Sequence, residues 1–193
     1  MSRVPEHEAS VGELVERFRA IESVLKEHAA HEDRWVEPVL RELRPDLAEE
    51  LAGEHTRLHA QLEEVAAAFA TWTAAGDRMT AGHLAHGALA AFVGPYLTHM
   101  SREENEAMPV IQAAMADEQI LAISANLRGS IPPPRLAEFM AFMLPAMNIA
   151  ERSALFTGLK ANAPAEVLDG MCHLAAEVLD AASWSAVCNH VGI

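Results

Sequence analysis

The segment LKEHAAHEDRWVEPVL, residues 25–40, is echoed by LTHMSREENEAMPVI, residues 97–111. Each segment contains a histidine, a glutamate four residues later and a proline ten residues after the histidine. Residues four apart in a helix lie on one face, so each pair can present an imidazole and a carboxylate to a single point. These are ligands that suit iron, manganese or zinc. The repeat therefore predicts two helices with the same metal-binding motif. The predicted pairs are His28 with Glu32 and His99 with Glu103.

Apolar residues at three- and four-residue steps predict long helices around both motifs. The first runs from about residue 10 to 41, the second from about 47 to 73, and the third from about 80 to 123. Asp46 is a fair N-cap for the second helix, and Pro95 should kink the third or remove a backbone hydrogen bond. Three long antiparallel helices with short connections predict an all-α, up-down helical bundle.

The middle helix supplies two further histidines, His55 and His59, again four residues apart. With a rise of about 1.5 Å per residue, the three pairs lie at levels in the bundle that agree within roughly 9 Å. A single His-x-x-x-Glu pair on a helix is usually a solvated surface pair. Two copies with the same downstream proline, and a third pair at a compatible level between them, favour one metal-binding layer inside the bundle.

The chain changes character after Leu127, where an acidic segment gives way to a more apolar one. Three consecutive prolines within residues 129–134 are typical of a linker or a rigid turn. We therefore divide the chain into residues 1–127, which form the bundle helices, and residues 128–193, which pack on the bundle or complete it. Shorter helices are predicted in the second segment at about 134–147, 150–160, 164–180 and 182–190.

The composition excludes several classes of partner. The formal net charge is −14 at pH 7, and so acidic a surface repels nucleic acid and anionic membranes. No stretch reaches the roughly 20 apolar residues of a membrane span, and the first ten residues lack the apolar run of a signal peptide. We therefore expect a cytoplasmic protein in which Cys172 and Cys188 are buried thiols. Motifs of nucleophilic, nucleotide-binding and thiol-redox proteins do not occur in the sequence.

The two His-x-x-x-Glu…Pro units, with Glu54-His55-x-x-Leu58 between them, resemble the hemerythrin and HHE cation-binding family over about residues 10–116. The resemblance implies antiparallel helices that hold two iron ions bridged by carboxylates, although ligand type does not exclude manganese or zinc. It implies the following roles for this chain: iron ligands His28, His55, His59 and His99, and bridging carboxylates Glu32 and Glu103.

The sequence departs from the family pattern at one place. Family members have a helix before the first motif helix, and that helix donates one more histidine. His7 is 21 residues before His28, about 31 Å along a continuous helix, which is too far to share a metal. Three alternatives are open. His173 on a C-terminal helix completes the centre and closes the bundle in circularly permuted order, or His173 is a core or surface residue, or a partner chain in a homo-oligomer supplies the fourth helix.

Three functions fit these observations. The first is a non-haem diiron protein that binds dioxygen or a related diatomic ligand as a carrier, sensor or store. The second is a diiron enzyme acting on peroxide, nitric oxide or an oxidisable substrate, so the sequence does not decide whether the protein is an enzyme. The third is a structural or regulatory module with a partial metal site. A dry apolar wall favours the first function, and its candidates are Val24, Leu58, Leu62 and Val93. Tyr96 shares the face of His99, where it either donates a hydrogen bond to a ligand or lines the core.

Overall fold

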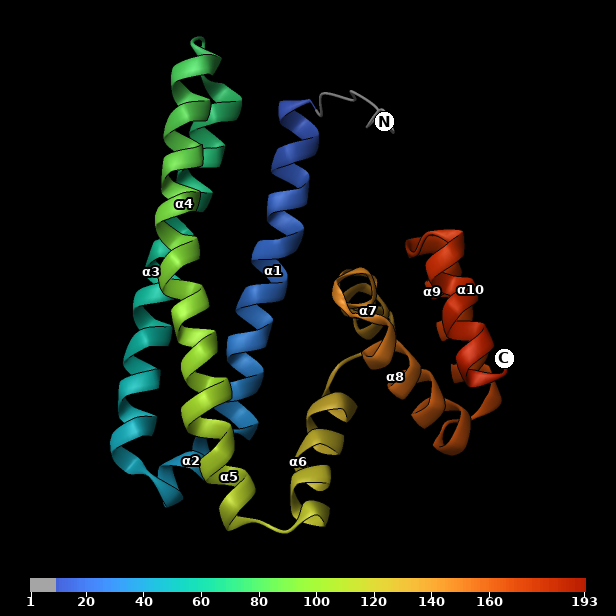
Figure 1. The fold of residues 1–193 in the computed structure, drawn as a ribbon. Helices are drawn as coiled ribbons and strands as arrows, with labels where there is room; N and C mark the ends of the chain where they lie inside the picture. The colour runs from blue at the N-terminus through green and yellow to red at the C-terminus, as the bar shows by residue number, and fades with distance from the viewer. Residues whose placement is uncertain (1–9) are drawn as a thin grey trace. The chain divides into compact units, whose positions relative to one another are not determined.

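The computed structural model describes residues 10–193, and His7 lies outside that range. Helices form all of the regular secondary structure in this part of the chain, which confirms the all-α prediction (Figure 1). The chain splits into two compact units with the boundary after Leu127, and each unit is described by itself.

The first unit contains the predicted long helices, except that the third ends at Ala114 instead of about residue 123 because the backbone is extended at Met115. Its elements are α1 (Val11–Trp35), α2 (Glu37–Leu43), α3 (Pro45–Ala74), α4 (Arg78–Arg102), the π-helical turn η1 (Glu103–Ala107), α5 (Met108–Ala114) and α6 (Asp117–Ser130), whose last residues belong to the second unit. α3 packs against both α1 and α4, and the three helices run side by side (Figure 1). They form the bundle that the apolar spacing predicts.

Some helix boundaries in the first unit differ from the predictions, at positions next to a proline or to a paired side chain. The predicted first helix is broken at Val36, after which α2 starts with a proline in its first turn. The prediction that Asp46 caps the next helix is wrong. α3 begins at Pro45, and the Asp46 carboxylate accepts hydrogen bonds from the guanidinium of Arg44 instead. Pro95 lies inside α4, which continues through it to Arg102.

Two apolar clusters form the core of the first unit. One joins α1, α3 and α4 and consists of Val15, Phe18, Leu58, Leu62, Val65, Phe69, Ala85 and Phe92. The other joins α2, α3, η1 and α5 and consists of Leu40, Leu47, Ala48, Leu51, Ala107 and Ile111. On α3, Leu51 belongs to the second cluster and Leu58 to the first, so His55 lies between the two. The candidate ligands therefore occupy a polar layer between two apolar ones.

The second unit is a set of shorter helices around its own core. They are α7 (Pro133–Ala146), α8 (Ile149–Asn162), α9 (Ala165–Val178) and α10 (Ala181–Val191). The core residues are Met140, Leu144, Phe156, Ala175, Leu179 and Val187. Asn148 and Glu151 form a capping box at the start of α8, and Asp180 caps α10. Cys172 and Cys188 are free thiols, and both are half-buried.

Two glycines of α4 are expected to respond oppositely to substitution by alanine. A Cβ on Gly82 would lie 2.9 Å from ring atoms of Trp72, whose indole N–H is held by the Arg78 carbonyl oxygen. A Cβ on Gly87 would meet nothing within 4 Å. We expect Gly87→Ala to raise the free energy of unfolding by about 0.5–1 kcal/mol, and Gly82→Ala to lower it because the ring must move. Urea denaturation of both variants tests this, and a stabilised Gly82→Ala would contradict the packing of α3 on α4.

Candidate metal centre

Side chains from three helices meet in the polar layer. α1 supplies His28 and Glu32, α3 supplies His55, α4 supplies His99, and η1 begins with Glu103. Among the described residues, two groups have ligand atoms that all lie within 4.8 Å of one another. One group is His55, His99 and Glu103, and the other is His28, Glu32 and Glu103. Glu103 belongs to both groups, so its carboxylate lies where two ion positions would adjoin.

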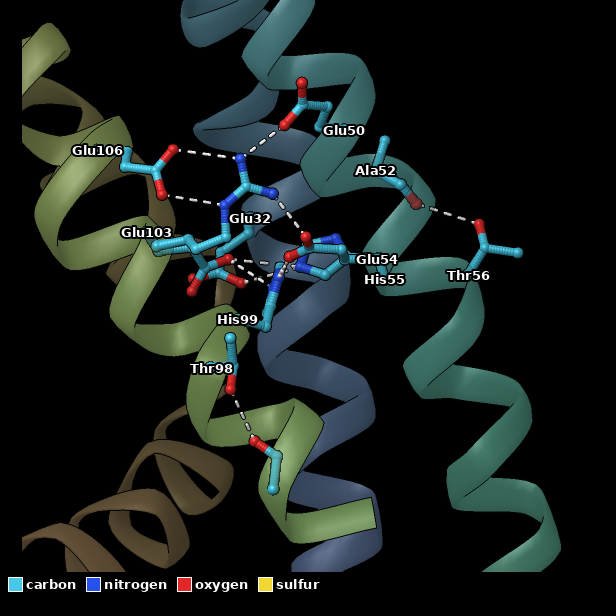
Figure 2. Close-up of polar contacts among 12 residues, drawn as sticks. Glu32, Glu50, Ala52, Glu54, His55, Thr56, Thr98, His99, Glu103 and Glu106 are labelled. Carbon is cyan, nitrogen blue, oxygen red and sulfur yellow. Dashed lines mark hydrogen bonds and ion pairs between the residues drawn. The ribbon is translucent and has the colours of Figure 1, made fainter. Parts of the chain in front are cut away.

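His55 and His99 turn their Nε2 atoms towards the carboxylates (Figure 2), and His28 does the same. The Nε2 atoms of His99 and His55 lie 2.9 Å and 3.4 Å from Glu103 Oε1. His55 Nε2 also lies 3.6 Å from Glu32 Oε2, and His28 Nε2 lies 3.2 Å from Glu32 Oε1. The His55 and His99 rings meet edge to face, with centroids 4.6 Å apart. Three imidazole nitrogens and two carboxylates therefore converge on one small region.

A π-helical turn begins at the shared glutamate. In η1 the Met108 N–H donates to the Glu103 carbonyl oxygen, five residues back, where an α-helix would use four. Such turns often occur at functional sites, because they widen the helix by one residue and re-aim the side chains after it. Here the turn separates Glu103, a member of both ligand groups, from α5, whose residues pack into the second apolar cluster. The His-x-x-x-Glu spacing does not indicate this turn.

Several ligand atoms are buried without a hydrogen-bond partner. They are His28 Nε2, Glu32 Oε2, His99 Nε2 and Glu103 Oε2. The close contact between His99 and Glu103 is not aligned as a hydrogen bond. A buried polar atom without a partner costs about 1–3 kcal/mol, so several in one place need an explanation. A cation at their meeting point supplies one, and imidazole nitrogen with carboxylate oxygen is a donor set that suits iron, manganese or zinc.

Comparison with known families agrees with this geometry. The family model of the hemerythrin HHE cation binding domain matches residues 1–111. The chain belongs to this family. The matched residues include the whole of α1, α3, α4 and η1 and hence every member of the two ligand groups. No curated protein and no solved structure matches the chain. None of its described helices is long and apolar enough to cross a membrane.

In the metal-free hemerythrin-like domain, the pKa shifts of His55 and Glu103 favour an ion pair between these two side chains. Glu103 and Glu32 beside the ring of His55 raise its pKa to about 10, with a further contribution from Asp33. Burial alone would raise the pKa of Glu103, but His55 and His99 hold it down at about 2. At neutral pH the metal-free domain therefore carries an imidazolium at His55 next to the ionised carboxylate of Glu103.

Metal binding to the hemerythrin-like domain should therefore release a proton. Histidine binds a metal only as neutral imidazole, so an ion that binds at His55 must displace a proton at pH 7, because the raised pKa of this ring is about 10. We expect release of about one proton with the first ion and a metal affinity that falls as the pH is lowered. Calorimetric titration with Co²⁺ in two buffers of different ionisation enthalpy measures this release. Equal heats in the two buffers would contradict it.

His59 is not a member of either ligand group. It is exposed and lies at the rim of a cavity of about 390 Å³ between α1, α3 and α4 that reaches His28, His55 and His99. Its assignment as an iron ligand stays a prediction. Leu58 and Leu62 line this cavity, as the apolar-wall prediction expected, whereas Val93 is 41% exposed and cannot serve as such a wall.

Tyr96 lines the same cavity and stacks on Phe92, with ring centroids 5.5 Å apart. It therefore packs against the core, which was one of the two roles that the sequence left open, and its hydrogen bond to a ligand stays a prediction. Burial raises the pKa of Tyr96 to about 12, and the charges of Glu32 and Glu103 act in the same direction. The hydroxyl stays protonated at neutral pH and can donate a hydrogen bond.

His173 lies on α9 of the second unit. Its side chain is 79% exposed, and its Nε2 atom lies 3.2 Å from Glu177 Oε1. His173 is thus no part of the second unit's core, and with Glu177 it forms a further His-x-x-x-Glu pair that the sequence reasoning overlooked. Its role as a metal ligand stays a prediction. Three other residues close to the centre were not singled out as a group from the sequence: Asp33, Glu54 and Arg102.

Proposed function

We propose that the hemerythrin-like domain holds two iron ions bridged by carboxylate and binds dioxygen or a related diatomic ligand, as a carrier, sensor or store. The observation that carries the proposal is the place of Glu103 in both ligand groups. A carboxylate with one oxygen for each of two cations is the usual way in which helical bundles build two-metal sites.

The residues present divide into two sets of ligands. His55 and His99 would hold one ion and His28 and Glu32 the other, with Glu103 between them. Three protein ligands leave coordination positions open for a small external ligand. A pair of ferrous ions supplies reversible electron transfer to such a ligand. Apolar side chains form part of the cavity wall next to the histidines, namely those of Leu58, Leu62 and Phe92.

The same cavity supports a second candidate, a diiron enzyme acting on peroxide, nitric oxide or an oxidisable substrate. Its volume of about 390 Å³ is several times what a diatomic molecule needs, and the Tyr96 hydroxyl that lines it can donate a hydrogen bond or a proton. The third candidate is a structural or regulatory module with a partial metal site.

A cytoplasmic location is part of the proposal, because thiols such as those of Cys172 and Cys188 stay unpaired in a reducing compartment.

Optical spectroscopy of the iron-loaded protein separates these functions. We would load the metal-free chain with ferrous iron without air, admit dioxygen, record the visible spectrum and then remove the dioxygen. A new band that disappears on removal supports reversible binding. Irreversible oxidation with turnover of added peroxide or nitric oxide supports the enzyme, and failure to retain iron leaves the partial-site module. The zinc-loaded protein is the control, because zinc has no redox chemistry and should give no band.

The contribution of His173 is tested separately. If His173 completes the centre, His173→Ala is expected to lower the metal content per chain. The matched control is His190→Ala, which removes an exposed histidine from α10 of the same unit. Metal content unchanged by His173→Ala would eliminate the circularly permuted arrangement.

A further inference from the structure

Each metal-facing imidazole of the group His55, His99 and Glu103 has a carboxylate on its other ring nitrogen. His99 Nδ1 lies 2.8 Å from Glu54 Oε2, and His55 Nδ1 lies 2.8 Å from Asp33 Oδ1. A carboxylate at Nδ1 accepts the ring hydrogen at that atom, so the proton that a metal displaces is the one on Nε2, and the ring is held with Nε2 towards the metal position. Both rings are therefore set in the binding orientation before an ion arrives.

Glu54 is itself held in place by an arginine. Arg102 Nη1 donates to Glu54 Oε1 at 2.5 Å, so Glu54 uses one oxygen for Arg102 and the other for His99. The same guanidinium donates to Glu50 on α3 and, through Nε and Nη2, to Glu106 in η1 (Figure 2). The Arg102 guanidinium is therefore held by carboxylates on α3 and in η1. A rotation of the Glu54 side chain would break one charged hydrogen bond at each of its two carboxylate oxygens.

The other ligand group is less constrained. His28 pairs with Glu32 of its own helix at 3.2 Å, and its side chain is 38% exposed, whereas that of His99 is 3% exposed. A partly exposed pair between residues four apart on one helix fixes a ring less than a carboxylate from a second helix does. The two ion positions therefore differ in how well their histidines are oriented in advance.

We propose that Glu54, clamped by Arg102, is a positioning residue that presets the ring of His99, and that the position formed by His55, His99 and Glu103 consequently fills first and holds its ion more tightly. The inference rests on the proposed two-ion centre but needs neither iron nor dioxygen. Partners of this kind change metal affinity by about 10- to 100-fold. Asp33 is expected to contribute less than Glu54, because its side chain is 52% exposed.

Titration of the metal-free protein with Co²⁺ against a competing chelator tests the proposal. We expect wild type to bind two ions in separate steps. Glu54→Ala should weaken the first step by about 10- to 100-fold and leave the second nearly unchanged. Glu54→Gln keeps an oxygen that can accept from His99 but loses the charge, so its effect should be smaller. Arg102→Gln should act in the same direction. Glu49→Ala, which removes an exposed carboxylate from the same helix, is the control.

A direct readout of the ring distinguishes positioning from a general effect on folding. The NMR signal of the Nδ1-bound hydrogen of His99 should be protected from exchange in wild type and lost in Glu54→Ala, while circular dichroism of the metal-free proteins stays the same. If Glu54→Ala does not fold, Glu54→Gln and Arg102→Gln provide the test.

Three results would overturn the proposal: an unchanged first step in Glu54→Ala, equal weakening of both steps, or wild type that binds fewer than two Co²⁺ ions. The last result would also overturn the two-ion centre. A different result separates the two proposals. If Co²⁺ binds in two steps that respond to Glu54→Ala as expected, but the iron form does not react with dioxygen, the proposed function is overturned and the positioning role of Glu54 stands.

Discussion

Substitution of Glu103 by alanine is expected to remove metal from both positions of the centre. Glu103 is the member that the two ligand groups share, and its Oε1 lies close to both His55 and His99. Loss of an outer partner already costs about 10- to 100-fold in metal affinity, so loss of a shared ligand should weaken each position by at least about 100-fold. Elemental analysis after dialysis against a weak chelator measures the retained metal.

The neighbouring glutamate provides a matched control. Glu104 is exposed and belongs to neither ligand group, although it lines a second cavity of about 160 Å³ beside the centre. Glu104→Ala should therefore retain the metal content of wild type. Metal loss in Glu104→Ala with retention in Glu103→Ala would show that the π-helical turn presents the other carboxylate to the metals, and the assignment of Glu103 would be wrong.

Substitution of Phe156 by alanine should cause the largest loss of stability in the second unit. Phe156 on α8 is completely buried, and its ring lies 5.1 Å from that of Trp184. Replacement of a buried phenylalanine by alanine costs about 3–5 kcal/mol, because it removes apolar contacts and leaves a cavity. Urea denaturation followed by circular dichroism measures this cost.

Phe142 allows the same substitution at an exposed site of the same unit. Its side chain on α7 is 46% exposed, so Phe142→Ala should change the free energy of unfolding by less than about 1 kcal/mol. A similar cost for both variants would mean that Phe142 is covered in solution. A small cost for Phe156→Ala would contradict the core assigned to the second unit.

The sequence predicted the long helices and most of the ligand layer because both depend on short-range periodicity. His28 with Glu32 and His99 with Glu103 meet as expected, since residues four apart share a helix face whatever surrounds them. The middle helix shows the limit of that reasoning. His59 follows His55 at the same spacing of four residues, yet it is exposed at the cavity rim and belongs to neither ligand group.

Other features depend on contacts between helices and could not be predicted from spacing. The clamp of Arg102 on Glu54 joins residues 48 positions apart, and it forms because α4 packs against α3 at this register. The apolar pattern also continues across the π-helical turn at Glu103 and the break at Val36, so it predicts neither of them. The contacts between helices affect how firmly the candidate ligands are held, whereas the repeated motif indicates which residues those ligands are.

Crystallographic anomalous scattering from the metal-loaded protein tests the two-ion centre most directly. Data collected at the absorption edge of iron should show two peaks about 3.5–4 Å apart, one beside His55 and His99 and the other beside His28 and Glu32, with Glu103 between them. A single peak, or peaks whose surrounding ligands do not include Glu103, would contradict the account.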